Sequence, residues 1–218
     1  MPNTPVSTIT RAATRKPGEP LNILTCPTHE RYESNLAATG HNFYAFQSDQ
    51  VKGWNTNYAA LPDNYTLLDG GLGNRQIPLD LDLDLVLSQN KFGQFQILSQ
   101  VAHSLNLPMV SLEHTLPVPS WDEKTRETMV QSRGDINVFI SDYSIDEWKF
   151  ERTPDVKVIK HCVDSQVFVD IQVQRENQIL SVVNDWINRD WCCGFQIYQL
   201  SLLVIPPAYL NQPERCLN

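Results

Sequence analysis

Apolar residues along this chain gather in short runs that are separated by polar turns and by segments with helical spacing. Seven of these runs are long enough for strands and too short for helices: Leu21–Thr25, Asn42–Phe46, Tyr65–Leu68, Asp84–Ser88, Leu107–Leu112, Asp135–Ser141 and Val156–His161. Most of them are continuously apolar rather than alternating. That pattern is typical of strands buried on both faces of a parallel sheet.

The clearest unit runs from Asp84 to Pro117 and predicts strand, loop, helix and strand. Between its two apolar runs, six residues recur at helical spacing: Phe92, Phe95, Leu98, Val101, Ala102 and Leu105. Asn106 and Pro108 then predict the end of the helix. One parallel βαβ unit is therefore expected at this point in the chain.

Three more helices are expected between the other strands. One begins near Thr28 or His29 and stops at Gly40, and another covers Asp142–Phe150. A third runs from Trp121 to about Arg133, with Ser120 as its expected N-cap. The alternation predicts an α/β fold: a Rossmann-like, doubly wound parallel sheet of about seven strands.

The domain organisation follows from where this alternation starts and stops. Residues 1–20 hold four prolines and no long apolar run, so a disordered leader is expected. Residues 21–170 hold the Rossmann-like domain. Residues 171–218 are expected to be an interdomain segment and the truncated start of a second domain, with Ile179–Asn184 as its first strand.

Charge and cysteine usage narrow the class of protein. The net charge of −8 argues against a generic nucleic-acid binder, because a basic surface is needed to contact phosphates. No run approaches the length of a membrane span. The five cysteines form no CxxC pair, so reduced thiols in a cytoplasmic protein are expected.

Two polar clusters are expected side by side at the carboxyl rim of the sheet, where ligands of such folds bind: Ser88-Gln89-Asn90 and Glu113-His114-Thr115. His114 is the candidate catalytic residue, because imidazole can act as a base or bind a hydroxyl. The alternative is a histidine that caps a strand end and bonds the backbone.

The candidate substrate-binding residues are Glu113, Thr115, Asn90, Gln89 and His29. Amide side chains suit sugar hydroxyls, although amides at strand exits are also common turn residues. Glu113 either orients His114 or is a surface acid, and His29 either faces the rim or only starts a helix. His161 and Asp164, at the end of the last strand, are expected to be structural.

The run Lys157–Phe168, which contains Val163-Asp164-Ser165-Gln166-Val167-Phe168, resembles the interdomain segment of GT-B glycosyltransferases, with its (H/N)-G-(V/I)-D-x-x-x-F pattern. The chain is similar to the family 4 type, "glycosyl transferases group 1", over residues 21–195. The chain departs from the family pattern at one residue and in one loop. Cys162 stands at the usual glycine, and Cys26-Pro27-Thr28-His29 replaces a glycine-rich loop.

The resemblance implies two Rossmann-like domains that face each other across a cleft. The first mainly holds a glycan, lipid or protein acceptor, and the second holds the nucleotide-sugar donor, a co-substrate. Transfer in this family is expected to be retaining and metal-independent, with no further cofactor. This chain would supply the acceptor side, with a second chain or a missing domain supplying the donor site, and is not expected to be active alone.

Two other readings remain open. One is a non-catalytic Rossmann-like module, or truncated remnant, that binds a sugar or nucleotide. The other is a metal-dependent glycosyltransferase of the GT-A type, in which Asp80, Asp82 and Asp84 would hold a divalent cation. Against the metal reading, these acids precede their strand and are expected at the amino end of the sheet, away from the ligand crevice.

Overall fold

The computed structural model describes residues 14–47, 53–68, 81–163, 165–166, 168–172 and 190–204. The chain divides into two compact units, Met1–Asp164 and Ser165–Asn218. Within the described part of the second unit lie two helices, α6 (Asp190–Cys193) and α7 (Phe195–Val204). The predicted strand Ile179–Asn184 and residues 1–13 of the predicted leader lie outside the described residues.

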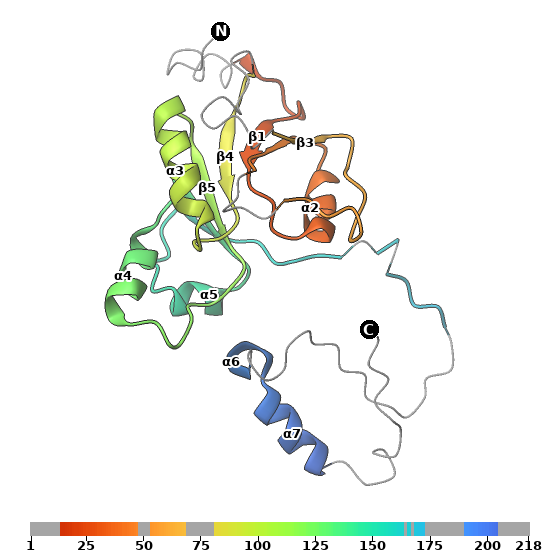
Figure 1. The fold of residues 1–218 in the computed structure, drawn as a ribbon, viewed down its shortest axis with the longest axis vertical. Coiled ribbons are helices and arrows are strands. Elements are labelled where there is room, and N and C mark those ends of the chain that lie inside the picture. The colour runs from red at the N-terminus through yellow and green to blue at the C-terminus, as the bar shows by residue number, and fades with distance from the viewer. Residues whose placement is uncertain are drawn as a thin grey trace. The chain divides into compact units, whose positions relative to one another are not determined.

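The first unit is built on one parallel sheet of seven strands (Figure 1). Its strands are β1 (Asn22–Thr25), β2 (Asn42–Ala45), β3 (Tyr65–Leu67), β4 (Leu85–Ser88), β5 (Met109–Glu113), β6 (Ile136–Phe139) and β7 (Val156–Val158). They lie in the order β3-β2-β1-β4-β5-β6-β7, and every neighbouring pair is parallel. The predicted α/β, Rossmann-like parallel sheet is confirmed.

Four described helices connect these strands: α2 (Glu30–Ala37), α3 (Gln94–Leu105), α4 (Glu123–Gln131) and α5 (Asp142–Glu147). Helix α3 ends as predicted at Asn106, which takes the left-handed conformation with a φ of 51°. The predicted N-cap of α4 was wrong. Asp122 caps this helix, since its side chain accepts a hydrogen bond of 2.7 Å from the Thr125 amide.

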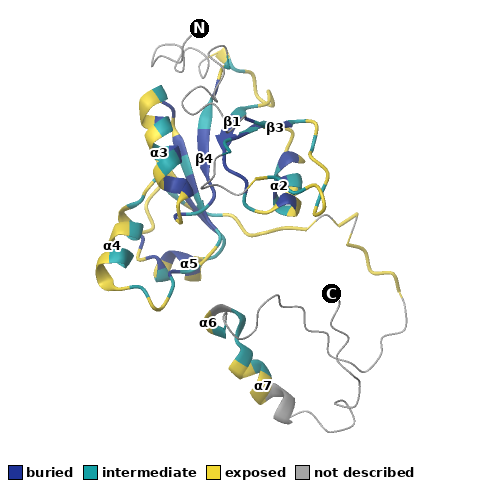
Figure 2. Cartoon of the chain, viewed as in Figure 1, coloured by how far each residue is buried: buried dark blue, intermediate teal, exposed yellow. Residues whose placement is uncertain are grey.

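The core lies on both faces of the sheet because the crossovers leave β1 and β4 in opposite directions. On one face α3 buries Phe95, Leu98 and Ala102 against the strands. On the other face Ala37 of α2 packs against residues of β1, β2, β3 and β4. Figure 1 shows these two helices on opposite sides of the strands, and Figure 2 shows the strands buried while the outer surfaces of α3 and α4 are exposed.

Helices α4 and α5 complete the layer at the β6–β7 edge. A third core cluster joins Phe139 of β6 to Ile145, Trp148 and Phe150 in and after α5, with Met129 and Val130 of α4 packed against it. Among the described helices, none is both long and apolar enough to cross a membrane.

Candidate functional site

The order of the strands changes direction between β1 and β4, which are hydrogen-bonded neighbours although 62 residues separate Leu24 from its register partner Val86. The helices that follow these strands cover opposite faces of the sheet, so the chain segments leaving β1 and β4 diverge there. In open α/β sheets this switch point, at the carboxyl ends of the strands, is where ligands bind. The segments that line it begin with Cys26 and Gln89.

A buried carboxylate network fills the floor of the switch point. The Oε1 atom of Glu33, from α2, accepts hydrogen bonds from the backbone amide and the hydroxyl of Thr28, both at 2.8 Å. It also accepts one of 2.9 Å from the side-chain Nε2 atom of Gln89. Its Oε2 atom accepts a bond of 3.1 Å from the Tyr65 hydroxyl. Burial raises the pKa of Glu33, and these hydrogen bonds offset part of the rise. The network ties α2 and β3 to the exits of β1 and β4.

Glu113, the last residue of β5, holds the loop that follows it. Its Oε1 atom accepts hydrogen bonds from the amide and hydroxyl of Thr115, at 3.2 and 2.8 Å. Its Oε2 atom accepts one of 3.2 Å from the Lys91 amide, in the loop after β4. The side chain is buried, and burial raises its pKa. Glu113 therefore joins the two loops at the rim, and its carboxylate is bound within the chain.

Beneath this rim Lys91 is almost completely buried, with only 1% of its surface exposed. Its Nζ atom lies over the rings of Phe95, Trp148 and Phe150, at 5.3, 5.8 and 5.2 Å from their centroids. It also donates a hydrogen bond to the backbone carbonyl of Ser132. Burial lowers the pKa of Lys91 to about 8. This cation lies inside the protein and is not presented to solvent.

His114 follows β5 directly and lies against two other rings. Its Nδ1 atom is 3.0 Å from the Nε2 atom of His161, in the segment after β7. The ring of Tyr32, from α2, meets His114 edge-on with the centroids 4.6 Å apart, and is 5.7 Å from His161. The Nε2 atom of His114 is buried and makes no hydrogen bond within the described part of the chain. We call His114, His161 and Tyr32 the ring cluster.

The protonation states of the ring cluster follow from its burial. Desolvation, and after it the neighbouring His161, lower the pKa of His114 to about 4. His114 is therefore a neutral imidazole near pH 7. Burial also raises the pKa of Tyr32 to about 12, so its hydroxyl remains protonated. The cluster thus holds one neutral, buried nitrogen that has no hydrogen-bond partner within the described residues.

The other predicted site residues lie in different surroundings. Gln89 is completely buried in the Glu33 network, and its Oε1 atom has no hydrogen-bond partner within the described residues. Asn90 is half-buried and its Oδ1 atom accepts a turn-forming bond of 3.0 Å from the Phe92 amide. Thr115 is exposed and bonded to Glu113, as described above.

His29 is exposed at the N-cap of α2, where its side chain makes no capping hydrogen bond. Its ring contact is with Tyr58, at 6.1 Å between centroids. It is Tyr32, three residues further along α2, whose ring contacts His114. The sequence predicted that His29, after the first strand, either faces this rim or only starts a helix, and it lies at the N-cap of α2.

Sequence reasoning did not select Tyr32, Glu33 or Lys91 as residues of this rim. Tyr32 and Glu33 lie in an ordinary amphipathic helix pattern, and nothing local distinguishes Glu33 from an exposed acid. One feature of the sequence could have pointed to Lys91, since it lies only three residues after the end of the buried strand β4. His161 was noticed but was expected to be structural.

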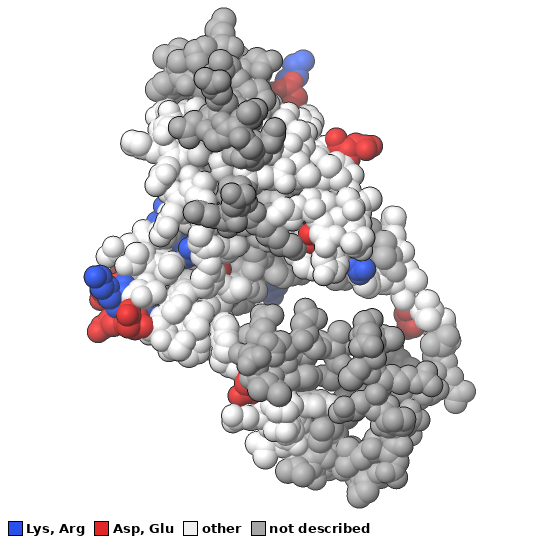
Figure 3. Space-filling view, viewed as in Figure 1, with Lys and Arg blue, Asp and Glu red and all other residues white. Residues whose placement is uncertain are grey.

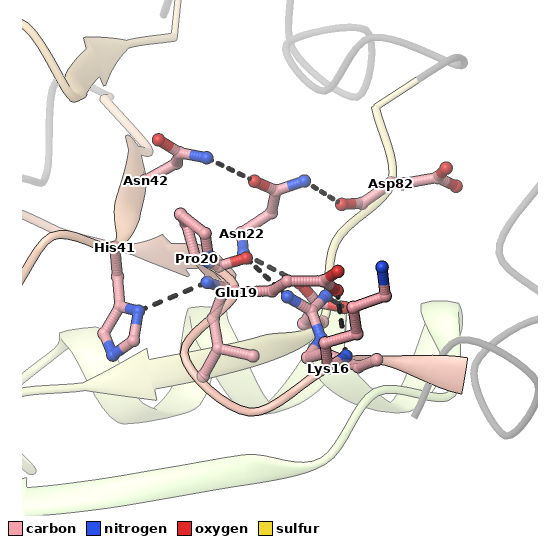
Figure 4. Close-up of polar contacts among 10 residues, drawn as sticks. Lys16, Glu19, Pro20, Asn22, His41, Asn42 and Asp82 are labelled. Atoms are coloured by element: carbon pink, nitrogen blue, oxygen red, sulfur yellow. Dashed lines mark hydrogen bonds and ion pairs between the residues drawn. The ribbon is translucent and has the colours of Figure 1, made fainter. Parts of the chain in front are cut away.

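The two described acids of the metal hypothesis, Asp82 and Asp84, lie at the opposite, amino rim. Asp82 is exposed, and its backbone carbonyl accepts a bond of 2.7 Å from the Asn22 side chain (Figure 4). The Asp84 carboxylate accepts a bond of 2.8 Å from the Asn22 amide and pairs with Arg15. Asp80 lies outside the described residues. Arg15 and the residues up to Pro20, part of the predicted leader, lie within the described range.

Further contacts brace the same amino rim. The Asn42 side chain donates a bond of 2.9 Å to Asn22, and the Leu21 amide donates one of 3.2 Å to His41, which links the starts of β1 and β2 (Figure 4). Within the described ranges, no three His, Cys, Asp or Glu side chains converge as metal ligands would. The described polar contacts of Asp84 at this rim are structural.

Surface charge on the face drawn in Figure 3 is mixed in sign. Exposed acids and bases gather together over α4, which carries Glu123, Lys124 and Glu127 with the half-buried Arg126. The rim residues described above are mostly neutral or have their charge bound inside the chain.

Comparison of the sequence with protein-family models found no match, and comparison with curated proteins found none either. What is established for this chain is its fold, a Rossmann-like α/β unit with one all-parallel sheet of seven strands.

Proposed function

We propose that the first unit of this chain is the acceptor-side domain of a GT-B type glycosyltransferase, which transfers a sugar from a nucleotide-sugar to a hydroxyl of an acceptor. One observation carries the proposal: the neutral ring of His114 lies at the carboxyl rim of a parallel sheet, and its buried Nε2 atom has no hydrogen-bond partner within the described residues. That is the rim where such folds bind ligands, and the atom suits a hydroxyl group.

The other rim residues have supporting roles in this proposal. Glu113 and Gln89, bound within the chain, hold the two loops in place. Asn90, Thr115 and His29 are the polar side chains that would contact sugar hydroxyls, alongside His114. The ring of Tyr32, which is nearly perpendicular to that of His114, restricts how the ring of His114 can turn.

The proposed reaction retains configuration and uses no metal. A bond forms between the acceptor oxygen and the anomeric carbon while the bond from that carbon to the phosphate oxygen breaks. The acceptor hydroxyl proton passes to the departing phosphate oxygen, so no protein group has to accept it. Residues that hold the diphosphate would lie in a second domain or chain, and this chain supplies the acceptor wall.

Binding of sugars to the full chain tests the proposal. Saturation-transfer difference NMR with methyl glycosides and nucleotide-sugars is expected to detect sugar binding, and His114→Ala is expected to weaken it by about tenfold or more. His103→Ala, an exposed histidine in the last turn of α3, is the matched control. Failure of every sugar to bind, or binding that is the same in His114→Ala, would refute the proposal.

A second candidate is a non-catalytic sugar- or nucleotide-binding module. It is favoured by the state of the two rim carboxylates, since Glu33 and Glu113 are both bound by donors of the chain itself. A transfer assay separates the two candidates. Glycosylated product that forms when the chain is mixed with a nucleotide-sugar, an acceptor and a donor-binding domain supports the enzyme. Binding without product under all these conditions supports the module.

The metal-dependent alternative with Asp80, Asp82 and Asp84 makes a different prediction in the same assay. Product formation that continues in excess chelator excludes it. Loss of product in chelator, restored by a divalent cation, would favour it over the metal-independent proposal.

A further inference from the structure

The contact between His114 and His161 restricts where their protons can be. Only 3.0 Å separates the Nδ1 atom of His114 from the Nε2 atom of His161, so one of these nitrogens donates a proton to the other. Both nitrogens cannot carry a proton at this distance, because the two hydrogens would collide. The pair therefore has two neutral arrangements, and each fixes the tautomer of His114.

In the first arrangement His161 donates from Nε2 to Nδ1 of His114, and the proton of His114 is then on its own Nε2 atom. In the second His114 donates from Nδ1, and its Nε2 atom is left with a lone pair. The first arrangement puts both rings in the Nε2–H form that neutral histidine favours in water. It makes the Nε2 atom of His114 a donor, and the second would make it an acceptor.

When the pair gains a proton, only the arrangement in which His161 donates to His114 remains possible. A charged His161 carries protons on both ring nitrogens and can only donate to His114. A charge on His114 instead is disfavoured, because its ring is packed against Tyr32 and its Nε2 atom is buried. His161 is exposed and can carry the charge in water. The direction of the bond is then the same whether His161 is charged or neutral.

We propose that His161 is a positioning residue that donates a hydrogen bond to Nδ1 of His114, so that the proton of His114 is on its Nε2 atom, which is buried and has no partner within the described residues. The placement of the proton follows from the geometry of the ring pair, from the tautomer that neutral imidazole favours and from the burial of His114, and it does not depend on the proposed function. Its consequence for a sugar rests on the proposed function: His114 would donate to an oxygen of the acceptor rather than remove its proton. That agrees with a transfer in which the departing phosphate takes the proton.

The neighbouring titratable groups do not reverse this direction. From α2, Tyr32 faces both rings, and Glu33 behind it is bound by Thr28, Tyr65 and Gln89. From β5, the Glu113 carboxylate is bound by Thr115 and the Lys91 amide. Lys160 and the free thiol of Cys162 flank His161 in the chain. Both Glu33 and Glu113 thus have intrachain partners other than the imidazoles.

The test reads the tautomer directly. In the full chain labelled with ¹⁵N-histidine, the nitrogen shifts of His114 report which nitrogen is protonated, and single substitutions assign the five histidines. We expect a protonated Nε2 and an unprotonated Nδ1 at neutral pH. A His114 ring protonated at Nδ1 in the wild-type chain overturns the proposal, with or without sugar binding.

Two variants sharpen this test. His161→Glu places a carboxylate, which only accepts, opposite Nδ1, so His114 should change to the Nδ1–H form. His161→Gln offers an amide N–H at about the same reach and should keep the wild-type tautomer. His103→Gln is the control and should change neither nitrogen shift of His114. An unchanged tautomer in His161→Glu, in a chain with a native backbone spectrum, also overturns the proposal.

Sugar binding is measured separately on the same samples. If the tautomer is as proposed and no sugar binds, the proposed function fails while the role of His161 stands. If sugar binds and Nδ1 of His114 carries the proton, the role of His161 fails alone.

Discussion

The side-chain Nε2 atom of Gln89 lies 2.9 Å from Oε1 of Glu33. The first residue after β4 is therefore joined directly to helix α2 across the switch point of the sheet. Both side chains are completely buried. This bond is one of several that converge on a single carboxylate. Removing that carboxylate leaves the donors of Thr28, Tyr65 and Gln89 without their acceptor.

Glu33→Ala is therefore expected to lower the free energy of unfolding of the first unit by about 3–5 kcal/mol, because buried donors lose their partner together. Urea denaturation followed by circular dichroism measures the loss. Glu127→Ala, an exposed acid on α4, is the control and should change the value by no more than about 0.5 kcal/mol. A loss for Glu33→Ala as small as the control's would show that the network does not stabilise the fold.

Lys91→Met should change how stability depends on pH. Burial lowers the pKa of Lys91 from its ordinary 10.5 to about 8, so between these pH values the unfolded chain holds a proton that the folded chain has lost. Stability from this group therefore rises as pH increases from 8 to 10.5. Below pH 8 the buried charge costs on the order of 3 kcal/mol.

Replacing Lys91 by methionine, which fits among the same aromatic rings, removes that charge and that rise. We expect Lys91→Met to be more stable than the wild type by about 1–3 kcal/mol at pH 7, with the difference shrinking towards pH 10. Lys124→Met, at an exposed position of α4, should behave as the wild type at both pH values. A constant difference between Lys91→Met and the wild type across this range would show that Lys91 does not titrate there.

Trp148→Phe should loosen the loop that carries His114. The indole of Trp148 is completely buried and donates a hydrogen bond of 2.8 Å to the carbonyl of Thr115. Phenylalanine cannot make this bond and leaves space around its smaller ring. The free energy of unfolding should fall by about 1–3 kcal/mol.

The same Trp148→Phe variant should broaden the NMR signals of His114 more than those of His103. The control is Trp121→Phe. Trp121 is half-buried, its ring centroid is 6.1 Å from that of Trp148, and it takes no part in the hydrogen bond to Thr115. If Trp121→Phe disturbs His114 as much as Trp148→Phe does, packing of the aromatic cluster, and not the bond to Thr115, holds the loop.

The proposed transfer reaction predicts a graded effect at His114. In an assay with a nucleotide-sugar, an acceptor and a donor-binding domain, His114→Ala should lower the rate by about tenfold, the effect of one lost hydrogen bond. His114→Gln keeps an N–H donor and should retain more activity than His114→Ala. The reverse order would contradict a donor role for His114.

His114 should also make the stability of the fold depend on pH in the acid range. His114 has a pKa lowered to about 4, against an ordinary 6.5, so the folded chain resists its protonation. Stability from this group is complete above pH 6.5 and is lost as pH falls towards 4, because the unfolded chain binds the proton first. In His114→Phe, the loss of stability between pH 6.5 and 4 should be smaller than in the wild type.

The sheet could be predicted because its signals are local. Continuous apolar runs such as Val86 and Leu87 in β4 report burial on both faces, and the helical spacing from Phe95 to Leu105 gives the crossover between β4 and β5. The exact ends of the helices were harder to predict, because neighbouring residues can compete for the same capping position. Ser120 and Asp122 are both good N-caps, and α4 uses the second.

The position of the carboxyl rim was predicted from the sequence, but only some of the residues that form it were. Local pattern alone places the Gln89-Asn90 and Glu113-His114-Thr115 segments after adjacent strands, and β4 and β5 are indeed neighbours. The contact of His114 with His161 spans 47 residues, and that with Tyr32 joins a helix from the other face of the sheet. No periodicity within a segment carries such information, because these contacts depend on strand order and crossover direction.

Hydrophobic spacing along the chain thus specified the elements and the fold class, since burial on a strand or helix face leaves a short-range period in the sequence. The partners of each polar group were decided by tertiary structure. Glu33, Glu113 and Lys91 appear in the sequence as ordinary charged residues. Only the packing of α2, β5 and α5 around them removes them from water, shifts their pKa values and binds them to particular donors and acceptors.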